Sequence, residues 1–260
     1  MNAPSLPFAL ERAIVIHARP TTVFRHFTDS ERWAAWWGTG STIDAQPGGR
    51  VFIRHPNAVE IAGEVVAVDP PRSIVFTYGY VSGQPFPPGA SRVTIRLSED
   101  RQGTRLELRH EFADAQAREH HVQGWRYQLA LFANAVADHL LDGAAARVDA
   151  WFAAWSDPDA ARRKAQLDLA VSPEIRFRDR FSLVEGRADL EPQLAAVHMF
   201  MPGHRIERAG ELRQCQGLGL ADWIMRGPDG AEKGRGTNVF GFDADGRIAD
   251  VVGIWSPPGR

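Results

Sequence analysis

The feature that most constrains the fold of this chain is a long amphipathic stripe that follows a series of strand-like segments. Its apolar residues recur at steps of three and four, which places them on one face of a helix. They are Val122, Trp125, Leu129, Phe132, Val136 and Leu140. Asp114 can cap this helix, and Asp142-Gly143 can end it because glycine readily adopts the left-handed conformation of a C-terminal cap. An antiparallel sheet with one apolar face needs a cover, so we predict that the helix packs on the preceding strands.

The segments before this helix alternate with a period near two, as half-buried strands do. Strands are predicted at residues 10–17, 51–55, 58–68, 74–80, 93–97 and 104–111. Turn signals separate them, among them Asp69-Pro70-Pro71 and the Gly- and Pro-containing loop 83–89. Together they predict an antiparallel meander, with short helices near Pro20 and Trp33 after its first strand.

After Gly143 the pattern starts again. Helical spacing covers residues 148–155, and a second helix is expected to run to about residue 169 because Ser156-Asp157-Pro158 offers a cap and a first-turn proline. Further elements are predicted at 175–178 (strand), 188–199 (helix), and 205–212, 214–226, 234–242 and 248–255 (strands). The element orders of the two halves differ, so no internal repeat relates them. We predict an α+β chain of two domains, residues 8–142 and 144–258.

Charge and composition exclude several classes of protein. The 260 residues carry 30 Lys and Arg against 32 Asp and Glu, a formal net charge of −2. Duplex-binding proteins usually show a basic patch and a high pI, so we expect no nucleic-acid partner. No apolar run approaches the ~20 residues of a membrane-spanning helix, and residues 1–5 show no signal-peptide pattern. The one cysteine, Cys215, cannot form an internal disulfide. We therefore expect a cytoplasmic protein that makes no membrane contact.

Several short motifs of the first half occur in a characteristic order. They are Arg19-Pro20-Thr21-Thr22-Val23-Phe24, Trp36-Trp37, Pro47-Gly48-Gly49, Gly63-Glu64-Val65, Asp69-Pro70-Pro71, Gly103-Thr104-Arg105-Leu106 and His121 to Trp125. With these motifs, residues 8–142 resemble the START-like (SRPBCC) superfamily, in the branch named after the Aha-type activator of a heat-shock chaperone ATPase. The resemblance implies a helix-grip fold, in which a curved antiparallel sheet wraps a long C-terminal helix and leaves a cavity for an apolar ligand.

The second half carries a different set of motifs. They are Trp151-Phe152-Ala153-Ala154-Trp155, residues 157–159, Ile175-Arg176-Phe177-Arg178-Asp179, Gly186 with Asp189-Leu190, and Asn238 to Phe242 leading into Asp245-Gly246-Arg247-Ile248. With these, residues 144–258 resemble the SnoaL-like and ketosteroid-isomerase-like superfamily, which shares the nuclear-transport-factor cone. The resemblance implies a cystatin-like α+β cone barrel with an apolar pocket.

This second resemblance implies a catalytic role for Asp179, which directly follows a predicted strand. In the isomerases an Asp at the matching position takes a proton from a carbon beside a ketone, which requires a carboxylate in a mostly apolar pocket. Trp151 stands where that family has a Tyr, and Asn238 where it has a neutral acid. Both offer an N–H to a developing oxyanion, but neither is a proton donor in the acid–base sense. The alternatives are an Asp that bonds backbone amides of a turn and a Trp151 that belongs to the core.

Aromatic residues are the candidates for ligand contact. In the first half these are Trp33, Trp36, Trp37, Phe52, Tyr78 and Trp125; in the second, Trp223 is added. The alternative for each is ordinary core packing. Asp222 and Trp223 are adjacent in a strand, so one lines the cone and the other faces outward. The histidines show no recognised zinc spacing, and we expect neither a metal site nor a cofactor.

The sequence thus favours binding of a small apolar molecule in one or both cavities. Proton-transfer chemistry of the isomerase or polyketide-cyclase type, with Asp179 as general base, is an extension that the sequence leaves open. The alternative is a stress protein that activates a chaperone ATPase and has no catalysis. A homodimer is a further expectation, because cone domains commonly pair through the outer face of their sheet.

Overall fold

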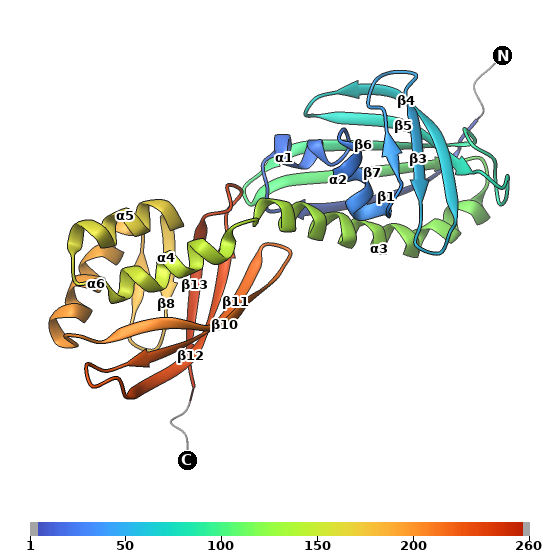
Figure 1. Ribbon diagram of the computed structural model, residues 1–260. Coiled ribbons are helices and arrows are strands. Elements are labelled where there is room, and N and C mark those ends of the chain that lie inside the picture. Colours follow the sequence, from blue (N-terminus) through green and yellow to red (C-terminus); the bar gives the residue numbers. More distant parts are fainter. Residues whose placement is uncertain (1–4, 257–260) are drawn as a thin grey trace. The chain divides into compact units, whose positions relative to one another are not determined.

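The computed structural model describes residues 5–256. The chain divides into two compact units, Met1–His139 and Leu140–Arg260, and each contains one sheet with its own helices (Figure 1). This is the predicted α+β class. Residue 258, where the second predicted domain ends, lies outside the described residues.

Seven antiparallel strands form the sheet of the first unit, in the order β1-β7-β6-β5-β4-β3-β2. They are β1 (Phe8–Ile16), β2 (Thr42–Ile43), β3 (Arg50–Arg54), β4 (Glu60–Asp69), β5 (Ser73–Tyr80), β6 (Ser91–Asp100) and β7 (Gly103–Phe112). Consecutive strands from β2 to β7 are neighbours, which confirms the predicted meander, and β1 pairs with the free edge of β7. Strand β2 was not predicted because two residues are too few to show a period.

Three helices accompany this sheet: α1 (Pro20–Arg25), α2 (Ser30–Trp37) and α3 (Ala115–Leu140). The cap predicted for α3 is present, since the Asp114 carboxylate accepts hydrogen bonds from the amides of Gln116 (2.8 Å) and Ala117 (3.1 Å). Helix α3 lies along one face of the sheet (Figure 1). The middle of its apolar stripe is buried, from Trp125 to Val136. The predicted helix-grip arrangement is therefore confirmed.

A cluster of aromatic rings fills the space between α2, α3 and the sheet. Trp36 lies 4.3 Å from Trp37 and 5.0 Å from Trp33, measured between ring centroids, and Phe27 stacks on Phe132 of α3 at 4.7 Å. Each of these five side chains is at most 5% exposed. Buried aromatic pairs contribute both apolar area and ring–ring attraction, so this cluster holds α2 and α3 in place.

A second buried group at the α3–β7 contact is polar and fully directed. The indole of Trp125 donates to Nδ1 of His110 (2.9 Å), so this nitrogen carries no proton. Nε2 of His110 must then carry the proton and donate to the Ser91 hydroxyl (2.8 Å), which donates to the carbonyl of Tyr78 (2.8 Å). Every hydrogen-bonding group is satisfied only while His110 is neutral.

The buried histidines of this unit resist protonation. Burial lowers the pKa of His26 from 6.5 to about 4 and holds the pKa of His110 well below its usual range. In the unfolded chain the same side chains titrate near 6.5. Between these values the unfolded state binds more protons than the folded state, so folding stability falls as the pH falls.

We expect the first unit to lose stability as the pH falls from 6.5 to 4, because the unfolded state binds more protons than the folded state in this range. The His26 contribution is fully present above pH 6.5, and its loss at pH 4 amounts to about 3 kcal/mol. Hydrogen-exchange mass spectrometry of peptides from α1 and α3 measures this loss for the first unit alone. His26→Asn, which keeps a donor and does not titrate, should show a shallower pH dependence; a slope equal to that of the unmodified protein contradicts the assignment.

The second unit has a six-stranded mixed sheet in the order β10-β11-β12-β13-β8-β9. The strands are β8 (Val171–Arg178), β9 (Leu183–Glu185), β10 (Arg205–Cys215), β11 (Leu218–Arg226), β12 (Glu232–Phe242) and β13 (Ile248–Trp255). Strand β8 runs parallel to β13, and the other pairs are antiparallel. Helices α4 (Ala144–Ser156), α5 (Ala160–Ala170) and α6 (Arg187–Phe200) share one apolar core with the inward residues of the sheet.

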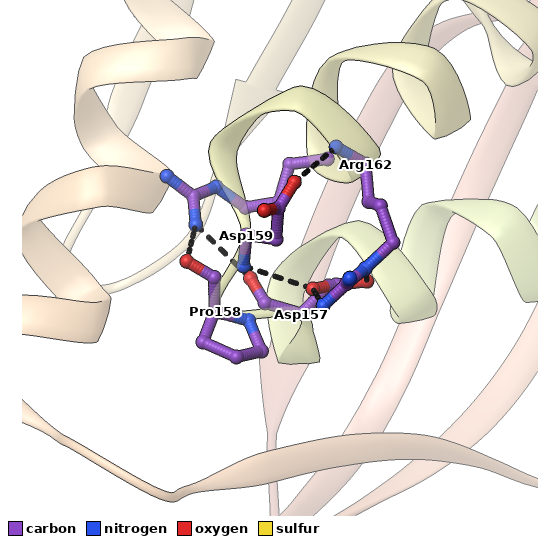
Figure 2. A network of polar contacts seen from close by, with 5 residues as sticks. Asp157, Pro158, Asp159 and Arg162 are labelled. Atoms are coloured by element: carbon purple, nitrogen blue, oxygen red, sulfur yellow. Dashed lines mark hydrogen bonds and ion pairs between the residues drawn. The ribbon is translucent and has the colours of Figure 1, made fainter.

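The turn between α4 and α5 is held by a polar network (Figure 2). Helix α5 begins after Asp159, whose side chain accepts a hydrogen bond from the amide of Arg162 (2.8 Å). The cap therefore lies two residues beyond the predicted Asp157. The reason is that the Asp157 carboxylate is bound by the guanidinium of Arg162 (2.8 and 2.9 Å), which lowers the pKa of this carboxyl to about 2.

Candidate functional site

The second unit contains a cavity of about 400 Å³ between its sheet and helices α4 and α6. Its walls are largely aromatic: Trp151, Phe152, Trp155, Phe177, Phe181, Trp223 and Trp255. Four polar side chains also line it: Asp179, Ser182, Gln193 and Asn238. Predominantly apolar walls with a few placed polar groups are typical of small-molecule sites.

Two tryptophans lie on the sheet side of the cavity, and glycines of β12 leave space for them. Trp223 of β11 and Trp255 of β13 flank Gly236 of β12 across the ladder, and their ring centroids are 4.8 Å apart. A Cβ on Gly236 would lie 2.6 Å from Cζ2 of Trp223 and 2.3 Å from the carbonyl oxygen of Ile254. Only glycine fits there without a shift, so Gly236 sets where the Trp223 indole lies. Gly234 does the same for Trp255, since a Cβ there would lie 2.9 Å from Cζ3 of that indole.

Asp179 lies immediately after β8 and is held by two donors. One carboxylate oxygen accepts the amide of Phe181 (2.8 Å), and the other accepts the indole N–H of Trp255 (3.1 Å). The side chain is half-buried and lines the cavity. The bond to the Phe181 amide is the turn contact that the sequence offered as the non-catalytic alternative for Asp179. The bond to the Trp255 indole holds the other oxygen beside the tryptophans of the cavity wall, so the carboxylate both stabilises the turn and lines the cavity.

Asn238 of β12 lies beside Asp179. It pairs across the ladder with Gly253 of β13, where a Cβ would lie 3.0 Å from Cβ of Asp179 and 3.3 Å from Oδ1 of Asn238. Asn238 is 5% exposed, and within residues 5–256 its amide has no hydrogen-bond partner. The Trp151 indole is also on the cavity wall, and the indoles of Trp155 and Trp223 there are buried without a hydrogen-bond partner in the same described range. The cavity thus presents a carboxylate, a neighbouring amide and an indole N–H among aromatic rings.

The structure brings four of the predicted site residues together in this cavity: Asp179, Asn238, Trp151 and Trp223. Asp222 points to the opposite face of the sheet, where the Thr237 hydroxyl donates to its carboxylate (2.6 Å).

The six candidates of the first unit lie in other surroundings. Trp33, Trp36 and Trp37 pack against one another in the aromatic cluster, and the Trp125 indole is bound to His110. Phe52 lies on the other face of β3 from the buried Val51, with the Arg50 guanidinium 5.0 Å from its ring centroid. Tyr78 is buried beside His110, and burial raises the pKa of its hydroxyl above its usual range.

Sequence reasoning missed Trp255, Gly253 and Phe181 as site residues. Trp255 was assigned only to the end of a strand, although it binds the Asp179 carboxylate. A usable signal was present, since glycine inside a strand often marks a close approach of neighbouring groups, and Gly253 lies two residues before Trp255.

In the part of the chain that the structure describes, no three His, Cys, Asp or Glu side chains are placed to hold a metal ion. Across residues 5–256 there is also no helix with the length and hydropathy needed to span a membrane.

Residues 17–137 match the family model described as "Activator of Hsp90 ATPase homolog 1-like protein". The first unit is thus a START-like domain of this family, as its motifs predicted. No curated protein matches the chain.

Solved structures similar to this chain include a putative isomerase of the SnoaL-like family from Agrobacterium tumefaciens. It is 27% identical, with a TM-score of 0.41, and the match covers 43% of this chain and 96% of the other. Protein Ms6760 from Mycobacterium smegmatis is 26% identical, with a TM-score of 0.43, over 51% of this chain and 90% of its own. Protein MLL2253 from Mesorhizobium loti is 21% identical, with a TM-score of 0.43, over 48% of this chain and 93% of its own.

We expect Gly236→Ala to destabilise the second unit by about 2 kcal/mol, because the added methyl group overpacks the tryptophan wall. The matched control is Gly241→Ala on the same strand, where the nearest atom to the new Cβ is Cβ of Asp250 at 3.3 Å. Hydrogen exchange of β11–β13 peptides reports the change within this unit. Equal losses in the two variants would show that strand glycines matter here only through backbone entropy.

Proposed function

We propose that the second unit binds a small, largely apolar carbonyl compound in its cavity, and that Asp179 takes a proton from the carbon beside the carbonyl group. The observation that carries this proposal is the pairing of a half-buried carboxylate with an unpartnered amide, that of Asn238, in a cavity walled by aromatic rings. A cavity of about 400 Å³ is within the size range of small-molecule sites.

The proton transfer follows from the positions of these groups. Asp179 accepts the proton, and the electron pair of the broken C–H bond forms the double bond of an enolate, whose charge moves to the carbonyl oxygen. The Trp255 indole and the Phe181 amide hold the carboxylate in position throughout. Since side-chain bases contribute most when they are oriented toward the reacting proton, this fixation supports the role of Asp179.

The enolate oxygen needs donors, and the two that the sequence indicated, the amide of Asn238 and the indole of Trp151, lie on the cavity wall. The buried indoles of Trp155 and Trp223 on the same wall have no hydrogen-bond partner in the described part of the chain. Donors oriented before the reaction stabilise developing charge in a dry site. Because neither donor gives up its proton, Asp179 itself returns the proton. Return to a different carbon gives an isomer; attack of the enolate carbon on a second carbonyl of the same molecule closes a ring. Neither outcome needs a cofactor.

A role as an activator of a chaperone ATPase stays a prediction that rests on the description of the family matched by residues 17–137. The proton-transfer proposal concerns the second unit and does not depend on that role.

The test is exchange of carbon-bound protons in D2O, followed by NMR over a panel of cyclic and unsaturated ketones. We expect catalysed exchange at the carbon beside the carbonyl with the unmodified protein, and a loss of about 100-fold in Asp179→Asn. Asn238→Ala should slow exchange while the ketone still binds, because the amide acts on the developing charge.

The matched control is Asp222→Asn, which removes the same charge from the outer face of the same sheet and should exchange as the unmodified protein does. Undiminished exchange in Asp179→Asn would rule out Asp179 as the base. Native mass spectrometry of the freshly purified protein adds an independent readout of the class of any retained molecule.

A further inference from the structure

We infer that the ligand of this cavity carries a positively charged amine, since a carboxylate without an ion pair lies among aromatic rings in a cavity that no cationic side chain of residues 5–256 lines. The inference rests on the proposed function and makes it more specific: the carbonyl compound that the cavity binds also carries a charged amine, which contacts the rings and the Asp179 carboxylate.

The charge balance of the cavity is the first argument. Asp179 is the one charged residue among those that line it, and within residues 5–256 its carboxylate makes no ion pair. Neither arginine beside it in sequence forms an ion pair with it: Arg178 binds Asp250 (3.2 Å), and the Arg180 guanidinium lies 4.9 Å from the ring centroid of Phe181. A carboxylate that is partly removed from water gains most from a cation placed beside it.

The rings around this carboxylate are the second argument. The ring centroids of Phe181 and Trp223 lie 5.3 and 4.8 Å from that of Trp255, whose indole N–H donates to Asp179. The faces of aromatic rings attract ammonium groups, tryptophan most strongly, and such rings recognise alkylated amines in other proteins. The Arg180 guanidinium over Phe181 shows that one of these rings already contacts a cation.

The same features disfavour the other classes of ligand. An anionic group would meet the Asp179 charge and the electron-rich ring faces, with no Lys, Arg or His on the described wall to bind it. A neutral ligand fits the apolar walls but leaves the carboxylate unpaired. An amine satisfies both, and where it carries an N–H, the unpartnered amide oxygen of Asn238 can accept it as well.

The test compares two probes of the same shape, benzyltrimethylammonium and its neutral isostere neopentylbenzene, in NMR titrations of the full chain. We expect the cation to bind about 10-fold more tightly, from its contacts with the rings and the carboxylate. The indole N–H signal of Trp255 should shift during the titration, which places the probe in the cavity. In Asp179→Asn the preference for the cation should disappear, whereas Asp222→Asn should keep it.

Phe181→Leu is a second variant, at a side chain that is 68% exposed and therefore tolerant of replacement. This variant should bind the cation more weakly and the neutral probe with unchanged affinity. If Asp179→Asn does not fold, the result with Phe181→Leu tests the inference in its place. Tighter or equal binding of the neutral probe overturns the inference but leaves the cavity as a ligand site. A preference for the cation that survives in Asp179→Asn also overturns it. Failure of both probes to shift the Trp255 signal overturns the inference together with the proposed site.

Discussion

The hydrogen bond from the Trp255 indole to the Asp179 carboxylate is the contact on which the second unit's site depends. It joins the end of β13 to the turn after β8, two segments that are 76 residues apart in the chain. Without it the carboxylate would be held only by its turn, and nothing would fix its second oxygen toward the cavity. The indole itself lies against Gly234 of β12, where a Cβ would lie 2.9 Å from its Cζ3. On the other side, a Cβ on Gly253 would lie 3.0 Å from Cβ of Asp179, so glycines leave the space in which both partners of this bond lie.

The two units use similar residues to different ends. In the first, the rings of Trp33, Trp36 and Trp37 pack on one another, and the indoles of Trp33 and Trp36 donate to the carbonyls of Phe52 and His26. In the second, Trp151 and Trp155 approach Phe177 from α4 while Trp223 and Trp255 lie on the sheet. Both groups line the cavity. Aromatic richness alone therefore does not identify a binding site, because the same rings serve a packed core or a cavity wall according to the layer that faces them.

Most of the element pattern could be read from the sequence, because it depends on local periodicity. The α3 stripe, its Asp114 cap and the meander that it covers all follow from spacings of two or of three and four residues. Strands β2 and β9 were not predicted because, with two and three residues, they are too short to show a period. The predicted start of α5 was wrong because Asp157 and Asp159 are both acceptable N-terminal caps. Arg162 decides between them: its guanidinium binds the Asp157 carboxylate, and its backbone amide donates to the Asp159 carboxylate.

The sequence by itself determined the order of the helices and strands, the likeness of each half to a superfamily, and which acidic residue to examine. Those features are local, or are carried by short motifs at fixed spacing. Only the tertiary structure decided that Asp179, Asn238 and Trp151 share one cavity, that Trp255 belongs with them, and that the tryptophans of the first unit pack against each other. Whether a ring borders a cavity is set by strand register and by the approach of a helix from far along the chain, and no spacing within one segment encodes that distance.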